Sequence, residues 1–351
     1  MADLDRICGI PFSDIIISSD STNKDLIYSP CCQAWLRPPY SCDYSYYVEE
    51  DIYGNFDIEN IWNSEKIQEF RRSIISGTYR YCNLEICPYW KSNMLLPVPE
   101  EAISYIEQKQ TNLSYAPVRI SANVDRTCNF FCPSCRNVKF SVPNIRTYNR
   151  LSVILSSGVR DLYLNGSGEI FFNSHYLRMM REFSSKKYPD VRSFDIISNG
   201  LNLNRTMWYS LSVDFKRLIK AITISIDAIN EETYKKIRLG GDFSIVRRNA
   251  GFISELRKKG ELKNFNLAYV LQKENINELP DFVKYAIDLG IDTLCVNKVE
   301  NWGHIIGNHY RNRMELPLNW KKMYEDKIFE AEALIKTSKI GLFSNVLNVK
   351  S

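Results

Sequence analysis

The chain has 351 residues, a formal net charge of +4 and an apolar share of 44%. This length suits two domains or one large α/β domain with an appendage, and the apolar share excludes general disorder. The small charge gives no reason to expect a nucleic-acid partner. The acidic start, Met1 to Arg6, lacks the apolar core of a signal peptide, and the apolar runs are too short to cross a bilayer. We therefore expect a cytoplasmic protein with no membrane partner.

Ten cysteines are distributed unevenly along this sequence. Nine of them lie within the first 135 residues, and the tenth is Cys295. In a cytosolic chain such a count indicates metal or redox chemistry rather than disulfides. A protein that used cysteine only as a small apolar residue would scatter these residues along its length.

The front of the chain, residues 1–95, has few helical signals and is rich in cysteine. Segments 13–18 and 26–32 predict two strands around a polar turn, and this hairpin would bring Cys8 near Cys31 or Cys32. Apolar residues recur at helical spacing from about Ile58 to Gly77, so we expect a helix there. Cys82 and Cys87 follow this helix.

From residue 117 onward, predicted strands alternate with predicted helices, after a linker with a short helix at 96–116. Repeated β-α units favour a parallel sheet with right-handed crossovers, and six units are too few for a closed eightfold barrel. We expect a partial, six-unit TIM-like barrel over 117–305, and a C-terminal helix and strand at 306–351 that pack on the barrel or the front domain. The predicted strands are 117–124, 160–165, 192–198, 221–227, 265–271 and 292–298, and the predicted helices include 144–157, 174–184, 231–237, 244–258 and 278–289.

Three cysteines, Cys128, Cys132 and Cys135, follow the first barrel strand at the spacing C-x3-C-x2-C. Thiolates this close on one loop converge on one soft metal centre. Three is one fewer than close a zinc site or fill a 4Fe-4S cluster, so the spacing favours a cluster with one open iron. A zinc knuckle with a distant fourth ligand and reduced core thiols are the alternatives.

With an aromatic residue, Phe131, directly before the second cysteine, this motif resembles the hallmark of the radical SAM superfamily. The resemblance implies that S-adenosylmethionine (SAM) binds the open iron. It also implies an external one-electron donor such as a flavodoxin or ferredoxin. The enzyme would cleave SAM to a 5′-deoxyadenosyl radical, which abstracts hydrogen from the substrate.

The front of the chain resembles SPASM or Twitch auxiliary-cluster domains. The shared features are Gly54-Asn55, Ile61-Trp62-Asn63-Ser64, Arg71-Arg72 and a closing cysteine pair. The resemblance implies a second 4Fe-4S cluster with four protein ligands, Cys8, Cys31 (or Cys32), Cys82 and Cys87, and a zinc ribbon in the same thiolates is the alternative. This front departs from the family pattern because it precedes the barrel and closes with C-x4-C. Cys42 has no assigned partner.

Polar residues follow the predicted barrel strands at their carboxyl ends, where ligands bind in such sheets. The turn Gly166-Ser167-Gly168-Glu169 resembles the family's GGE motif, so Glu169 or carbonyls of this turn would bind the SAM ammonium. Ser198 and Asn199 would bond to the ribose hydroxyls.

The segment from Ser225 to Phe243 resembles the family's S-x-D…Y-x-x-I-R-x-G-G-x-F segment. This makes Ser225 and Arg238 candidates for the SAM carboxylate, because arginine offers a fork that matches carboxylate geometry. Asp227 would face the substrate, and Leu271 would pack on adenine.

The substrate is less well determined by the sequence than the cofactors. Modification of a peptide or protein is our first expectation, and dehydrogenation or epimerisation of a sugar or other small molecule is the alternative. Cys295 would serve an epimerase as a hydrogen donor, although a buried inert thiol is the simpler reading. Asn301 to His304 would line the substrate pocket. A non-catalytic zinc-binding protein is the rival of another class.

Overall fold

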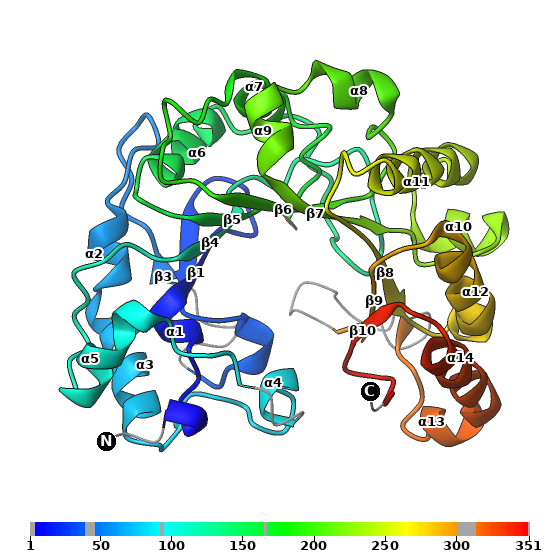
Figure 1. The fold of residues 1–351 in the computed structure, drawn as a ribbon, viewed down its shortest axis with the longest axis horizontal. Helices are drawn as coiled ribbons and strands as arrows, with labels where there is room; N and C mark the ends of the chain where they lie inside the picture. Colours follow the sequence, from blue (N-terminus) through cyan, green and yellow to red (C-terminus); the bar gives the residue numbers. More distant parts are fainter. Residues whose placement is uncertain (1–3, 39–45, 92–94, 165–166, 301–313, 350–351) are drawn as a thin grey trace. The chain divides into compact units, whose positions relative to one another are not determined.

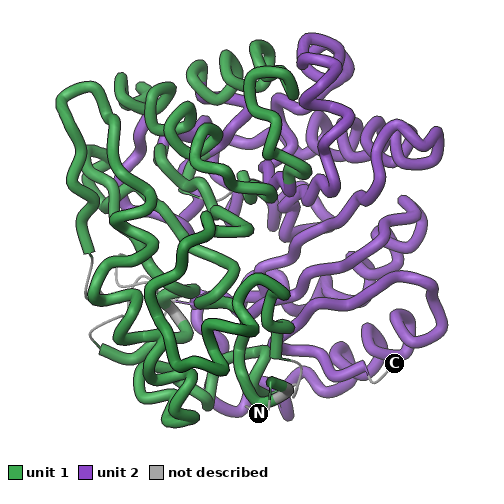
Figure 2. The backbone as a smooth tube through the Cα atoms, turned by 60° about the vertical axis from the view of Figure 1, so that its left-hand side comes forward, with its two compact units in different colours: residues 1–126, 142–168, 174–194 green, residues 127–141, 169–173, 195–351 purple. Residues whose placement is uncertain are grey.

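The computed structural model describes the chain except for residues 1–3, 39–45, 92–94, 165–166, 301–313 and 350–351. The chain forms two compact units, each built from several segments (Figure 2). Unit 1 comprises residues 1–126, 142–168 and 174–194, and unit 2 comprises residues 127–141, 169–173 and 195–351. The front cysteines thus belong to unit 1, and the cysteine loop (residues 127–141) belongs to unit 2.

Unit 1 contains strands β1 to β5 and the helices beside them (Figure 1). In chain order its elements are a 3-10 turn (Leu4–Arg6), α1 (Ile10–Ser13), β1 (Asp14–Ser19), β2 (Leu26–Ser29), a 3-10 turn (Gln33–Trp35), β3 (Tyr46–Tyr47), α2 (Ile58–Trp62), α3 (Glu65–Ile75), α4 (Pro88–Lys91), α5 (Glu100–Glu107), β4 (Arg119–Asn123), α6 (Thr147–Leu155), β5 (Asp161–Leu164) and α7 (Ser174–Glu182).

The hairpin predicted in the front of the chain is confirmed, since β1 pairs antiparallel with β2. The sequence did not predict that β1 also pairs in parallel with β4, which pairs in turn with β5. Ile15 and Ile17 are fully buried and alternate with half-buried neighbours along β1. The front therefore contributes strands to the same sheet as the barrel.

The helix predicted from Ile58 to Gly77 is instead two helices, α2 and α3. Asp57 caps α2 by accepting a hydrogen bond from the backbone N–H of Asn60, and Ser64 caps α3 by accepting one from Ile67. A capping side chain satisfies the free N–H groups of a helix start, so Ser64 begins a new helix where the periodicity alone suggests continuity.

Unit 2 contains strands β7 to β10 and most of β6, whose first two residues belong to unit 1. Its elements are β6 (Ser193–Ser198), α8 (Arg205–Ser210), α9 (Val213–Leu218), β7 (Ile219–Ser225), α10 (Glu231–Ile237), α11 (Phe243–Lys258), β8 (Asn264–Leu271), a 3-10 turn (Ile276–Glu278), α12 (Leu279–Leu289), β9 (Thr293–Lys298), α13 (Trp320–Met323), α14 (Glu325–Thr337) and β10 (Gly341–Ser344).

The strands make a mostly parallel ten-stranded sheet, with β7, β8, β9 and β10 paired in parallel. The order of the described strands has two ends, β3 and β10, so the barrel is partial, as predicted. The six predicted barrel strands and the tail helix and strand are confirmed. Helices α8 and α9 were not predicted. None of the described helices combines the length and apolar character needed to cross a bilayer.

One face of β7 to β9 packs against helices, and we call the opposite face the open face. Phe265, Leu267 and Tyr269 are buried on the helix-covered side of β8, where α11 and α12 lie (Figure 1). The residues between them are half-buried, which gives the strand a strict two-residue period. In register across the strands, the open face carries Thr223, Ser225, Asn266, Ala268, Val270, Thr293, Cys295 and Asn297.

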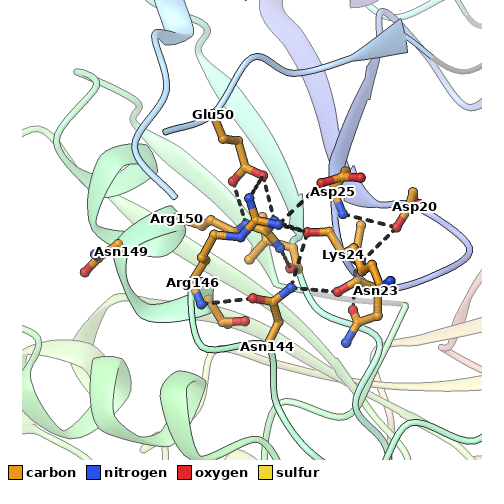
Figure 3. A network of polar contacts seen from close by, with 12 residues as sticks. Asp20, Asn23, Lys24, Asp25, Glu50, Asn144, Arg146, Asn149 and Arg150 are labelled. Carbon is orange, nitrogen blue, oxygen red and sulfur yellow. Dashed lines mark hydrogen bonds and ion pairs between the residues drawn. The ribbon is translucent and has the colours of Figure 1, made fainter. Parts of the chain in front are cut away.

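Within unit 1, a network of polar groups holds the chain where it leaves β4 (Figure 3). The Asp125 carboxylate accepts hydrogen bonds from the backbone N–H of Asn144 at 2.9 Å and the hydroxyl of Thr147 at 2.5 Å. It also accepts one from the Asn23 amide at 3.2 Å, and the amide oxygen of Asn23 accepts one from the backbone N–H of Arg126 at 2.7 Å. The residues that lead into the cysteine loop are thereby fixed to the β1–β2 turn and to the start of α6.

Arg150 is the buried cation of this network. Its guanidinium donates to both carboxylate oxygens of Glu50 at 2.7 Å and to the backbone carbonyls of Val124 and Lys24 at 3.2 and 2.6 Å. The Arg150 side chain is 0% exposed and the Glu50 side chain is 3% exposed. Glu50 also pairs with Arg146, whose Nη1 lies 3.2 Å from Glu50 Oε2.

We predict that Arg150→Met lowers the free energy of unfolding by about 1–3 kcal/mol, because buried Glu50 loses two charged hydrogen bonds and keeps only its contact with Arg146. Urea denaturation followed by circular dichroism measures the change. Lys235→Met is the control, because Lys235 and Glu231 are 67% and 62% exposed, and an exposed pair contributes little. Equal midpoints for the two variants would contradict the prediction.

Candidate active site

The cysteine loop places three sulfur atoms within reach of hydrogen-bond donors in unit 2. The backbone N–H of Phe130 lies 3.3 Å from Cys128 Sγ. Arg136 Nη2 lies 3.6 Å from Cys135 Sγ, and Arg238 Nη1 lies 3.9 Å from Cys132 Sγ. Donors and cations beside sulfur favour the thiolate, which is the form that binds metal.

Burial has the opposite effect on the free thiols. It raises the pKa of Cys128 to about 12 and the pKa of Cys132 to about 11, and Arg136 and Arg238 respectively lower these values in part. In the metal-free chain both thiols therefore keep their protons at neutral pH. Metal binding would displace those protons, so uptake of metal is coupled to proton release.

The loop after α10 lies against the cysteine loop. The backbone N–H of Phe131 donates to the carbonyl of Leu239 at 2.8 Å. Gly240 has a φ of +90°, and a Cβ there would lie 3.1 Å from the carbonyl oxygen of Asn129. A Cβ at Gly241 would lie 2.7 Å from the ring of Phe130. The glycine pair thus permits a close approach that side chains would prevent.

Glu169 is a buried carboxylate that joins three segments of unit 2. Its Oε1 accepts hydrogen bonds from the backbone N–H of Phe171 at 3.1 Å and the hydroxyl of Ser198 at 2.8 Å, and its Oε2 accepts one from the backbone N–H of Asn199 at 2.7 Å. Its own N–H donates to the carbonyl of Thr127 at 2.8 Å, at the start of the cysteine loop. Burial raises the pKa of Glu169, and these hydrogen bonds lower it.

The structure brings together Glu169, Ser198 and Asn199, which the sequence singled out as candidate SAM contacts. Asn199 also donates to Asn129 Oδ1 at 2.7 Å and lies 3.9 Å from Cys128 Sγ. Their predicted contacts with the SAM ammonium and ribose stay predictions. Gly166 lies outside the described residues, and Gly168 ends a segment of unit 1 directly before Glu169.

Arg238 and Asp227 form a buried ion pair with 2.5 Å between Nη2 and Oδ2. Asp227 has a φ of +63°, a left-handed conformation that aspartate tolerates better than most residues. Its Oδ1 accepts the backbone N–H of Val270 at 2.8 Å, and its carbonyl accepts the Asn275 amide at 2.8 Å. Asp227 therefore faces Arg238, and Arg238 bridges Asp227 and Cys132.

Three further predicted residues lie on β7 to β9. Ser225 ends β7 on the open face. Cys295 lies on the same face, in register with Ala268 and Phe343, and burial raises its pKa to about 11. Leu271 is fully buried and shares the helix-covered side of β8 with Leu267 and Tyr269, so the strand does not place it on the open face.

The front cysteines line a small cavity in unit 1. Cys8, Cys31, Cys82 and Cys87 line this cavity, and Cys32 is not among its lining residues. The other lining residues are Ile10, Pro11, Trp35, Leu36, Phe70, Ile74, Tyr79, Leu84, Trp90 and Leu95. The thiols are thus almost the whole polar content of an otherwise apolar wall.

Burial raises the pKa of Cys8 to about 11 and the pKa of Cys82 to about 12, and it raises the pKa of Cys31 well above its usual range. Neighbouring thiols raise each of these pKa values further, and Cys32 has the largest such effect on Cys31. This site suits a group that takes four thiolates and presents an apolar surface, rather than a hydrophilic ligand.

Within the described ranges, no three His, Cys, Asp or Glu side chains are arranged to hold a single metal ion. Ligands of an iron-sulfur cluster bind different iron atoms, so they need not converge on one point as the ligands of a zinc ion do.

The sequence missed several residues of this site. Asn129 lies inside the cysteine motif and Arg136 directly follows it, but the motif assigns no role to either residue. The Arg238–Asp227 pair joins positions eleven residues apart (238 − 227), and only the left-handed turn at Asp227 brings them together. Cys31 and Cys32 are equivalent in spacing arguments, and only the fold distinguishes them.

Comparisons with known proteins give partial matches. No protein-family model matches the chain. It is 27% identical over 207 residues to a GTP 3′,8-cyclase of Rhizobium etli, covering 57% of this chain and 56% of that protein. It is 24% identical over 180 residues to a probable GTP 3′,8-cyclase of Sulfurisphaera tokodaii, covering 50% and 54%. The chain thus matches about half the length of these relatives.

Among solved structures, the fold resembles SuiB of Streptococcus suis bound to S-adenosylmethionine. The match has a TM-score of 0.50 and 13% identity, and it covers 95% of this chain and 72% of the other. The shared fold agrees with two other findings, the C-x3-C-x2-C loop that follows β4 and the relatives above. Together these findings support a radical SAM enzyme.

The cofactors of the superfamily are a 4Fe-4S cluster and SAM, and the described residues fit them. The loop offers three thiols, one fewer than a closed site needs. Arg136, Arg238 and the backbone N–H of Phe130 approach the sulfur atoms that would hold the cluster. Glu169 and Asn199 lie in the same unit as the loop and adjoin it.

We predict that Glu169→Gln destabilises the metal-free chain by about 1–3 kcal/mol, because an amide cannot accept all three hydrogen bonds and buries an N–H₂ group against donors. Thermal and urea unfolding under reducing conditions measure this effect. Glu182→Gln is the matched control, since Glu182 is exposed. An unchanged stability in Glu169→Gln would show that the three hydrogen bonds to the carboxylate do not stabilise unit 2.

Proposed function

We propose that the chain is a radical SAM enzyme with an auxiliary iron-sulfur cluster, and that it modifies a peptide or protein. The observation that carries this proposal is the arrangement of the cysteine loop. Three buried or half-buried thiols each lie near a hydrogen-bond donor. The loop starts at Thr127, which is bound by the backbone N–H of Glu169, and the Glu169 side chain binds the end of β6.

When bound, the cluster and SAM supply the 5′-deoxyadenosyl radical that attacks a C–H bond. The residues of the chain bind and orient these groups. Cys128, Cys132 and Cys135 would hold the cluster, while Ser225 and Arg238 would bind the SAM carboxylate. Asp227 already holds the Arg238 guanidinium in place, so a carboxylate ligand would share this cation with Asp227.

The cysteine cavity of unit 1 would hold the auxiliary cluster through Cys8, Cys31, Cys82 and Cys87. Four thiolates leave no open iron, so this cluster would accept or relay an electron rather than bind SAM. An acceptor for one electron makes a net oxidation of the substrate reasonable. A protein electron donor would reduce the cluster of the cysteine loop.

The composition of the open face of unit 2 suggests that the reacting part of the substrate is polar and uncharged. Its residues are Thr, Ser, Asn, Ala, Val and Cys, with no formal charge among them. A peptide backbone satisfies this description. Two relatives are named GTP 3′,8-cyclase or probable GTP 3′,8-cyclase, so GTP is a second candidate. Formation of 5′-deoxyadenosine that rises with GTP in place of peptide would favour it.

The proposal predicts about eight irons per chain after anaerobic reconstitution, and 5′-deoxyadenosine after addition of SAM and dithionite. Replacement of Cys128, Cys132 and Cys135 by serine should leave about four irons and abolish SAM cleavage. Serine at the four cavity cysteines should also leave about four irons, with SAM cleavage retained.

Cys32→Ser is the matched control for the cavity variants, since Cys32 adjoins Cys31 but does not line the cavity. It should keep the full iron content. Zinc in place of iron, with no 5′-deoxyadenosine from the wild-type protein, would overturn the enzyme proposal and favour the structural zinc protein.

Cys295 distinguishes epimerisation from the other outcomes. Because burial raises its pKa to about 11, it stays a neutral thiol at pH 7, which is the form that can donate a hydrogen atom. If the substrate is epimerised, Cys295→Ala should abolish solvent deuterium incorporation into product while 5′-deoxyadenosine still forms. Unchanged deuterium incorporation in Cys295→Ala, with Cys32→Ala as control, would exclude this role.

A further inference from the structure

Tyr234 is a fully buried residue of α10 to which the proposed function assigns no task. Its ring packs against Phe243, with the centroids 5.1 Å apart. Its hydroxyl has no hydrogen-bond partner in the described part of the chain. Since buried polar groups are nearly always paired in folded proteins, an unpaired hydroxyl points to a partner that the metal-free chain lacks.

The surroundings of this hydroxyl identify that partner. A Cβ at Gly241 would lie 2.8 Å from Tyr234 Oη and 2.7 Å from Phe130 Cζ, so the hydroxyl lies where the loop after α10 meets the cysteine loop. Burial raises the pKa of Tyr234, Arg238 lowers it, and Cys132 raises it again. Tyr234 and Arg238 lie one helical turn apart, since the backbone N–H of Arg238 donates to the carbonyl of Tyr234 at 2.7 Å, and Arg238 Nη1 lies 3.9 Å from Cys132 Sγ.

Arg238 shows the same incomplete bonding. Its Nη2 pairs with Asp227 and its Nη1 lies 3.9 Å from Cys132 Sγ, but its Nε has no partner among the described atoms. Two buried donors, one neutral and one charged, therefore surround the Cys132 side of the loop. Neither Tyr234 Oη nor Arg238 Nε has an acceptor among the described atoms, and the sulfur atoms of a cluster are acceptors.

We propose that the Tyr234 hydroxyl donates a hydrogen bond to a sulfur atom on the Cys132 side of the iron-sulfur cluster and raises the reduction potential of that cluster. This inference rests on the proposed function. Reduction adds negative charge to the cluster, so a donor to its sulfur atoms stabilises the reduced form more than the oxidised form.

The test compares Tyr234→Phe with wild type after anaerobic reconstitution. The readout is the midpoint potential from a redox titration followed by EPR, using the signal that changes when SAM is added. The potential should shift to a more negative value in Tyr234→Phe, with the iron content unchanged. Tyr285→Phe is the matched control, because Tyr285 lies on α12 beside Arg247 and away from the cysteine loop.

A fluorinated tyrosine at position 234 provides a second variant that keeps the shape of the side chain. It is a stronger donor, so the midpoint potential should shift to a more positive value. This variant also decides the case in which Tyr234→Phe does not take up its cluster. A wild-type midpoint in the fluorinated variant would then overturn the inference.

The outcomes separate this inference from the proposed function. If wild type forms no SAM-sensitive cluster, the proposed function fails and the inference fails with it. If wild type cleaves SAM but Tyr234→Phe, with full iron, titrates as wild type does, only the inference fails. The hydroxyl would then be an unpaired group whose removal changes stability alone.

Discussion

The arrangement of unit 2 depends on one buried carboxylate. Glu169 accepts hydrogen bonds from Phe171, Ser198 and Asn199, and its backbone N–H fixes Thr127. A buried anion is costly unless it is fully bonded, so these segments are held in one relative position. The first cysteine of the loop follows Thr127 directly. A displacement of this loop would therefore leave the backbone N–H of Glu169 without its acceptor.

Buried charges that are neutralised by partners within the chain also occur at two other places. In unit 1, Arg150 and Glu50 are paired and buried, and Arg150 also holds the carbonyl of Val124 ahead of the cysteine loop. In unit 2, Asp227 adopts a left-handed backbone conformation and binds Arg238, which lies beside Cys132. Each pair is costly to bury. At each place the chain itself neutralises a buried charge.

Much of this architecture is readable in the sequence, since the signals are local. The spacing of Cys128, Cys132 and Cys135 predicted the loop, and two-residue and 3.6-residue periods predicted the strands and most helices. Ser64 is itself a capping signal that reveals the break between α2 and α3, although periodicity suggested one helix. The polar residues at the strand ends followed from the rule that parallel strands end at one edge.

The rest depends on pairings between residues that are distant in the chain. No local pattern in β1 shows that its second edge pairs with β4. A strand that is buried on one face has the same alternating pattern whether it lies in a separate hairpin or in the barrel sheet. The choice of Cys31 over Cys32 depends on which side chain faces the cavity. The Arg238–Asp227 pair and the unpaired Tyr234 hydroxyl depend on a turn and a close approach at Gly241, which spacing does not encode.

The most direct test of the central claim is EPR spectroscopy of the reduced, reconstituted protein with and without SAM. If the cysteine loop holds a cluster with an open iron, SAM should change the spectrum of the variant that lacks the four cavity cysteines, and amino-¹⁵N-labelled SAM should show coupling to the cluster. A spectrum unaffected by SAM, in a protein with a full iron content, would contradict the account.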